Sequence, residues 1–100
     1  MGQSRIDFQA ILETFTDNVY FQPPDNLQLE YPCIVYKREY VTTTFANDKP
    51  YIHKKRYMVT VIDRDPDSEI PDQVASLPLS AFNRSFTTES LYHDIYRVYF

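Results

Sequence analysis

The first apolar pattern in the chain has the spacing of a helix. Its apolar residues stand at i, i+3, i+4 and i+7 and form one stripe: Phe8, Ile11, Leu12 and Phe15. Ser4 can cap this helix, with Asp7 three residues later as a variant of the capping box. Asp17 and Asn18 end it, so the pattern predicts an N-terminal helix of about a dozen residues.

The pattern then changes to β-branched and aromatic residues that alternate with polar ones, as in strands. "VYFQ" predicts a short strand that Pro23 and Pro24 stop, and "PPDNLQLEYP" predicts a loop across the surface. Two long strands are predicted, at Cys33 to about Thr43 and at Tyr51 to Asp63. We expect them to pair as an antiparallel hairpin with its tip near Ala46 to Lys49.

A second helix and two further strands are predicted in the remainder of the chain. The helix shows apolar residues at i, i+4 and i+7: Ile70, Val74 and Leu77. Pro71 suits its first turn and Pro78 ends it. Ala81–Thr87 and Leu91–Phe100 follow as strands joined by "TTES". The order predicts one α+β domain over residues 1–100, in which an N-terminal helix and a second short helix pack on an antiparallel β-sheet of about four to five strands.

Composition excludes several classes of protein. Hydrophobic residues make up 43% and charged residues 24%, as in globular domains. There is no apolar run of about 18 residues and no signal-peptide pattern, so we expect no membrane contact and a cytosolic site of synthesis. The net charge of −4 argues against nucleic acid as the main ligand. The single glycine, Gly2, excludes phosphate cradles and tight glycine-dependent turns.

The acidic stretch "VIDRDPDSEIPD" is the strongest candidate for metal chemistry. An EF-hand loop counted from Asp63 needs glycine at position 6 and glutamate at position 12, where this chain has Ser68 and Val74. Asp67 and Ser68 instead suit a strand-to-helix turn, where carboxylates complement the helix N-terminus. We favour the turn, and a weak divalent-cation site stays open as the alternative for three carboxylates: Asp63, Asp65 and Asp67.

The remaining reactive residue types do not indicate an enzyme. We interpret Cys33 as a buried apolar residue, because no basic neighbour is present to lower its pKa. His93 and Asp94 are adjacent on a predicted strand and therefore point to opposite faces. No serine stands in a nucleophile-elbow context that could form a catalytic triad with His53. The basic run from His53 to Arg56 is a solvated strand end, a subunit contact or a phosphate contact. We expect no catalytic, cofactor-binding or metal-binding residues.

The aromatic content is the unusual feature of the chain. It has nine tyrosines and seven phenylalanines, and tyrosine is enriched at protein interfaces. One face of the last predicted strand carries Asp94 with four apolar residues: Tyr92, Tyr96, Val98 and Phe100. The other face carries Leu91, Ile95 and Tyr99. Helices can cover one face, so the other needs a neighbouring subunit, a second layer or the chain's own loops.

This arrangement resembles the tail terminator, or tail completion, proteins of long-tailed bacteriophages. The resemblance rests on the amphipathic helix, on "VYFQPPDNLQLEYPCIVY" with its Tyr31-Pro32 entry into a long strand, and on the hairpin around "FANDKPYIHKKRYMVTVID". It continues through the short helix after "DPDSEI" and the final pair of strands, and so covers nearly the whole chain.

The resemblance implies a virion structural protein assembled in the host cytoplasm. Such a protein forms a ring, usually of six copies, that caps the tail tube, stops its polymerisation and joins it to the neck or head-completion protein. DNA would pass only as cargo. A head-tail adaptor or neck protein is the alternative within virions, and a small non-virion binding module or a metal-dependent enzyme are the alternatives outside them.

Carried to this sequence, the resemblance implies contacts through the loop Pro23 to Tyr31 and the hairpin tip Phe45 to Tyr51. With the basic run and the last strand, the candidate contact residues with other subunits or the tube are Leu27, Tyr31, Phe45, Asn47, Asp48, Tyr51, Lys54, Arg56, Tyr92 and Tyr96.

Overall fold

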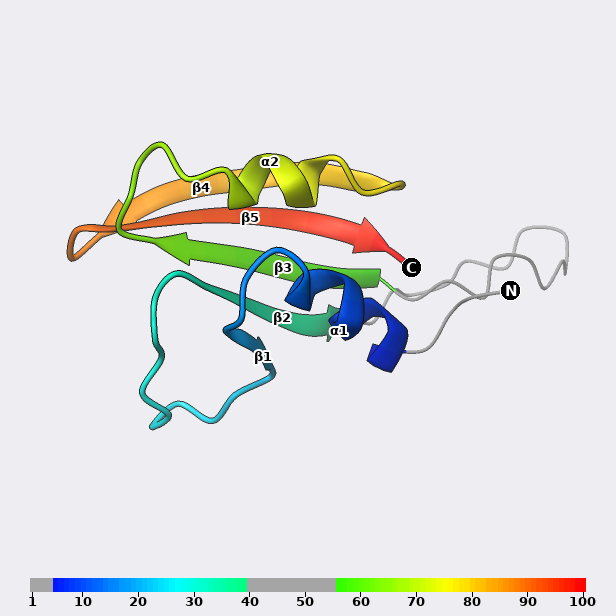
Figure 1. The fold of residues 1–100 in the computed structure, drawn as a ribbon, viewed down its shortest axis with the longest axis horizontal. Helices are drawn as coiled ribbons and strands as arrows, with labels where there is room; N and C mark the ends of the chain where they lie inside the picture. Colours follow the sequence, from blue (N-terminus) through cyan, green and yellow to red (C-terminus); the bar gives the residue numbers. More distant parts are fainter. Residues whose placement is uncertain (1–4, 40–55) are drawn as a thin grey trace, which may run out of the picture.

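The computed structural model describes residues 5–39 and 56–100, which form a five-stranded sheet with two helices (Figure 1). The strands are β1 (Val19–Phe21), β2 (Cys33–Glu39), β3 (Arg56–Asp63), β4 (Ser80–Thr88) and β5 (Leu91–Tyr99). Their order in the sheet is β1-β2-β3-β5-β4. β1 runs parallel to β2, and the other neighbouring pairs are antiparallel. The predicted α+β class and the antiparallel pairing of the two long strands are confirmed.

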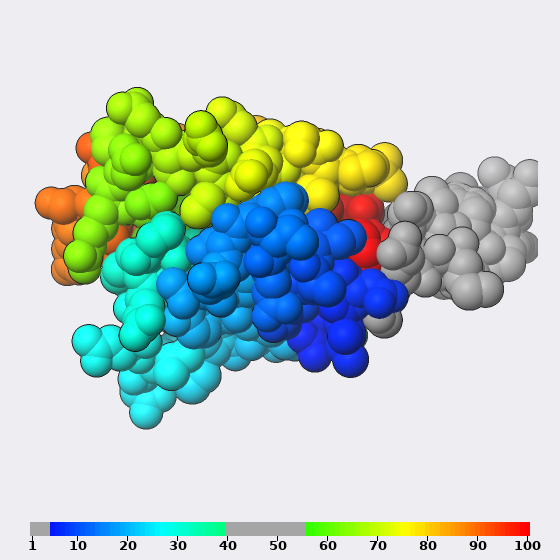
Figure 2. Space-filling model, viewed as in Figure 1, coloured from blue at the N-terminus to red at the C-terminus, as the bar shows by residue number. Residues whose placement is uncertain are grey.

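Helices α1 (Arg5–Glu13) and α2 (Ile70–Ala75) lie on the same face of the sheet (Figure 1). In the space-filling view they cover much of this face (Figure 2). Of the apolar residues that the two periods predict, α1 buries Phe8 and Leu12 and α2 buries Ile70 and Val74, whereas Ile11, Phe15 and Leu77 are half-buried. No helix in the described ranges is long and apolar enough to cross a membrane.

Tyrosines and valines from three strands complete the core beneath the helices. The Phe8 ring lies 4.8 Å from the Tyr57 ring and 5.5 Å from the Tyr36 ring, measured between centroids. Val59 of β3 pairs with Tyr36 of β2 on one side and with Tyr96 of β5 on the other. Since side chains alternate along a strand, this register assigns each strand residue to the helix side or to the opposite side.

The turn between β4 and β5 contradicts the prediction that a chain with one glycine has no tight turns of the glycine-dependent kind. Glu89 and Ser90 adopt φ angles of 51° and 64°, and positive φ at both central residues is the requirement of a type I′ hairpin turn. Glycine or asparagine is preferred at such positions, because other residues pay a steric penalty there. A tight turn of the glycine-dependent kind therefore occurs without glycine.

Candidate interaction surface

The face of the sheet opposite the helices, which we call the open face, combines cationic and apolar side chains. Strand alternation and register place five charged residues there: Lys37, Glu39, Arg56, Arg84 and Arg97. The apolar and aromatic residues among them include Met58, Phe86, His93, Ile95 and Tyr99. Among the strand residues that the structure describes on this face, four cations against one carboxylate give a net charge of +3, although the whole chain carries −4; Asp25 of the loop after β1 adds one carboxylate beside them.

One carboxylate holds two of these guanidinium groups. Glu39 Oε1 lies 3.0 Å from Arg56 Nε and 3.3 Å from Arg97 Nε. Arg97 Nη1 also donates a hydrogen bond to Asn83 Oδ1 at 3.3 Å. Asn83 lies at the irregularity in β4 between Phe82 and Arg84, where the register with β5 shifts. The network fixes Arg56 and Arg97 in place, and its single carboxylate leaves an excess of positive charge.

An aromatic group lies on the open face toward the β4 edge. The Phe86 and His93 rings stack with centroids 4.5 Å apart and an interplanar angle of 11°. The guanidinium carbon of Arg84 lies 5.5 Å from the centroid of the Phe86 ring. Phe86 and Tyr99 remain 41% and 38% exposed. Flat aromatic rings beside guanidinium groups are typical of surfaces that bind a partner.

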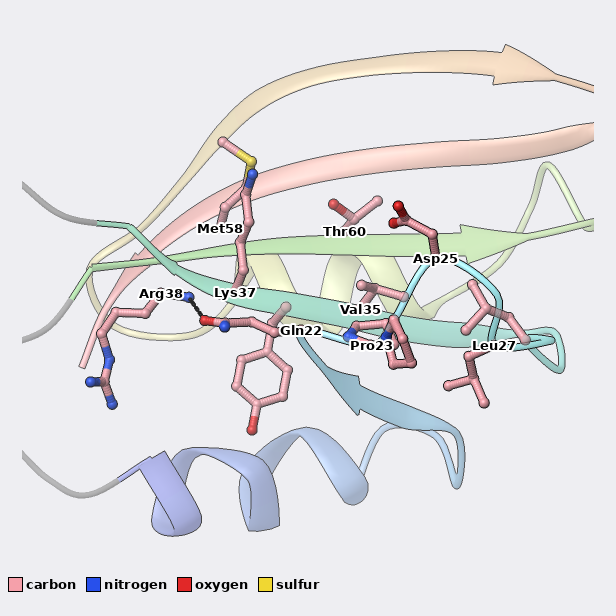
Figure 3. Close-up of a pocket in the computed structure, with 12 residues that line it drawn as sticks. Gln22, Pro23, Asp25, Leu27, Val35, Lys37, Arg38, Met58 and Thr60 are labelled. Carbon is pink, nitrogen blue, oxygen red and sulfur yellow. Dashed lines mark hydrogen bonds between the residues drawn. The ribbon is translucent and has the colours of Figure 1, made fainter.

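A groove of about 710 Å³ lies between the loop after β1 and the strands β2 and β3 (Figure 3). Leu27 and Pro23 of the loop lie near Val35 of β2, and Met58 and Lys37 rise from the strands at the other end (Figure 3). Gln22 Oε1 accepts a hydrogen bond from the Arg38 backbone N–H at 3.2 Å, and this bond connects the start of the loop to β2. The loop therefore covers part of the open face and leaves beside it a groove lined by both apolar and charged residues.

Two acidic turns lie together at one end of the sheet. The turn from β3 to α2 and the turn from β4 to β5 are neighbours, because Asp63 pairs with Tyr92 in the register (Figure 1). We call these two turns the acidic end; their exposed charged residues are Arg64, Asp65, Asp67, Glu69 and Glu89. Four carboxylates against one guanidinium give the acidic end a net charge of −3.

The carboxylates in the first of these turns organise the backbone. Asp63 Oδ1 accepts the Asp65 N–H at 3.0 Å, and Asp65 Oδ1 accepts the Asp67 N–H at 2.9 Å. Ser68 Oγ accepts the Ile70 N–H at 3.3 Å at the start of α2. These bonds support the interpretation as a strand-to-helix turn. Within residues 5–39 and 56–100, no three His, Cys, Asp or Glu residues are grouped to hold a metal ion.

The candidate reactive residues lie in settings that do not favour catalysis. Cys33 is fully buried, and burial, assisted by the negative charge of Asp63, raises the pKa of its thiol to about 12. His93 lies on the open face and Asp94 on the helix side, as their adjacency in a strand predicts. Burial raises the pKa of Asp94; the neighbouring His93 lowers it and Asp72 raises it further.

The described contact candidates have different surroundings. Leu27 is 43% exposed in the groove, and Arg56 lies on the open face. Tyr31 lies under the Arg64 guanidinium, whose carbon is 5.5 Å from the ring centroid. Tyr92 is 36% exposed on the helix side. Tyr96 is only 6% exposed, since it belongs to the core cluster and also packs edge-on against the exposed Phe82, and so offers almost no surface to a partner.

The other contact candidates are Phe45, Asn47, Asp48, Tyr51 and Lys54, and with His53 they lie outside the described residues. Sequence reasoning missed the residues that define the open face: Lys37, Arg84, Phe86 and Arg97. The alternation along each strand could have placed them on one side of that strand. Only the strand order brings them together on the same face of the sheet.

Comparisons of the chain with protein-family models, with curated proteins and with solved structures found no match.

Proposed function

We propose that this chain is a structural assembly subunit, the tail terminator of a long-tailed bacteriophage. In this function, copies of the chain form a ring, expected to contain six, that caps the tail tube, stops its polymerisation and joins it to the neck. The likeness of the whole sequence pattern to tail terminators is the starting point. The chemistry of the described residues supports a binding role better than a catalytic one, because the clustered carboxylates bond to turn backbone and the thiol is buried.

The observation that carries the proposal is the sheet with one covered and one open face. Both helices lie on the same side, and Phe86 and Tyr99 stay exposed on the other beside four cationic side chains. β4 also forms an edge of the sheet, and no strand among the described residues pairs with its outer side. A long edge strand with exposed aromatic residues is a template for contact with another chain. These features fit a subunit that is completed by its neighbours.

Tail length tests this function against its alternatives. A phage with a nonsense mutation in the gene for this chain should produce tails of irregular, excessive length, and supplying the chain from a plasmid should restore uniform tails. Normal tails beside unattached heads would instead favour a head-tail adaptor. Infectious particles of normal shape would refute a virion role and favour a separate binding module.

A further inference from the structure

The open face and the acidic end are complementary in charge and lie on different parts of the same chain. The open face carries +3 and the exposed residues of the acidic end carry −3. Arg56 and Arg97 form ion pairs with Glu39, which restricts the positions of their guanidinium groups. Each patch is therefore suited to receive the other patch of a second copy.

The Glu39 end of the open face is too far from the acidic end for the two to neutralise each other within one copy. Arg56 begins β3 and Asp63 ends it, and that length of strand spans about 23 Å at 3.3 Å per residue. This separation exceeds two Debye lengths at physiological salt, where the Debye length is about 8 Å. The cations at the Glu39 end of the open face are thus hardly affected by the acidic end. Arg84 lies nearer to it, because Arg84 pairs with Ile95 and Ile95 pairs with Thr60, three residues before Asp63.

We infer that the open face of one copy docks on the acidic end of the next copy, in a head-to-tail contact. The contact joins two different surfaces, so every copy keeps one free surface of each kind until the assembly closes. Such contacts produce a ring when the rotation between copies closes and a filament when it does not. The inference rests on the proposed ring for its biological role, and it names the surfaces that would build that ring.

A second copy fits the open face better than a nucleic acid does. Cations beside exposed aromatic rings could also bind a single strand through its phosphates and bases. However, the chain carries a net charge of −4, which disfavours binding to phosphates. The acidic end supplies a partner of opposite charge at the concentration of the protein itself.

Charge reversal on either patch should weaken association of the purified chain. One variant carries Lys37→Glu and Arg84→Glu on the open face, and the other carries Asp67→Lys and Glu69→Lys at the acidic end. All four side chains lie outside the Glu39 network, and a circular dichroism melt checks that each variant folds. We expect light scattering at about 50 mM salt to show assemblies of the unaltered chain that dissociate as salt screens the contact. Each variant alone should associate at least about tenfold more weakly, because like charges then meet.

Mixing the two variants is the decisive step. An acidic open face then meets a basic end, and a basic open face meets an acidic end, so the equimolar mixture should recover the assembly that each variant lost. The matched control is Arg64→Glu, which makes the charge change of one open-face substitution, cation to glutamate, at the acidic end instead and should leave association equal or tighter. An unaltered chain that stays monomeric, a mixture that does not recover, or an equal loss with Arg64→Glu would overturn the contact.

A fluorescent single-stranded oligonucleotide tests the competing ligand. Binding at physiological salt that the Lys37→Glu and Arg84→Glu changes abolish would assign the open face to nucleic acid and overturn the contact. We expect no rise in anisotropy. Different results would refute the proposed contact and the proposed tail function. Recovery on mixing, for a chain absent from virions, would retain the contact and remove the function, whereas a tail ring unaffected by either variant would do the opposite.

Discussion

Replacing tyrosine by phenylalanine should have opposite effects at two tyrosines buried side by side beneath α1. Tyr36 and Tyr57 are both fully buried, with ring centroids 5.8 Å apart. The Tyr36 hydroxyl donates to Gln9 Oε1 at 2.6 Å and accepts from Arg5 Nη1 at 3.1 Å. The Tyr57 hydroxyl is buried and has no hydrogen-bond partner among the described residues. Loss of the hydroxyl therefore removes two hydrogen bonds in Tyr36→Phe, whereas in Tyr57→Phe it removes a buried polar group that has no partner among the described residues.

The magnitudes follow from these contacts. A net hydrogen bond contributes about 0.5–1.5 kcal/mol. Arg5 Nη1 also donates to Gln9 Oε1 at 3.0 Å, so both partners of Tyr36 keep a bond after the substitution. We expect Tyr36→Phe to lower the free energy of unfolding by about 1–2 kcal/mol. Tyr57→Phe should raise it by about 1 kcal/mol, because a buried hydroxyl without a partner is costly.

Urea unfolding followed by circular dichroism measures this difference. With slopes of about 1–3 kcal/mol per molar urea and a combined difference of about 2–3 kcal/mol, the midpoints of the two variants should separate by roughly 0.7–3 M. The unaltered chain should fall between them. Equal losses in both variants, or a gain in Tyr36→Phe, would refute the assignment of the hydrogen bonds. Unchanged slopes serve as the control that neither variant alters the compactness of the unfolded state.

Four further predictions, one labelling experiment and three substitutions, test separate features. Cys33 should react with a thiol reagent only after unfolding, since its pKa of about 12 and its burial leave almost no accessible thiolate near neutral pH; fast labelling of the folded chain would contradict this. Ser90→Gly should raise the free energy of unfolding by about 1 kcal/mol by relieving the positive φ, and an unchanged or lower value in urea would count against it. Burial raises the pKa of Asp94 in the folded chain, and the charge of His93 opposes this shift. The folded state therefore favours the neutral carboxyl, and the free energy of unfolding linked to it is complete below the unfolded pKa of about 3.9. That contribution is lost as the pH rises through the folded-state pKa. The melting temperature of Asp94→Asn should therefore exceed that of the unaltered chain by more at pH 7 than at pH 4, and a gap independent of pH would exclude this cause. Tyr96→Asp should lower the free energy of unfolding by about 3 kcal/mol or more, because it places a carboxylate in the core; near-normal urea stability would show that the residue is not buried as described.

Local patterns predicted most of the elements. The period of α1 identified Phe8 and Leu12 as buried, and alternation located the strands of the β2–β3 and β4–β5 pairs. The turn before α2 was identified at Ser68, whose Oγ accepts the Ile70 N–H, because such turns depend on residues close in sequence; the N-cap position itself is Glu69, which makes no side-chain cap hydrogen bond. These features depend on backbone propensity and on neighbours a few residues apart, so a single sequence contains them.

The arrangement in space was less accessible. β1 has only three residues and pairs in parallel with β2, a contact between segments that no short-range pattern encodes. The strand order places β5 between β3 and β4, and this order unites Lys37, Arg84 and Arg97 on one face. Tyr96 was proposed as a contact residue because its strand has two apolar faces, and only packing against Phe82 and the core shows that its side is filled.

Cryo-electron microscopy of purified virions tests the proposed tail terminator function. We expect one ring of this chain between the last ring of the tail tube and the neck, with the open face of each copy against the acidic end of its neighbour. Density for the chain against the portal would contradict the terminator function in favour of an adaptor. Absence of the chain from the particle would contradict any structural role in the virion.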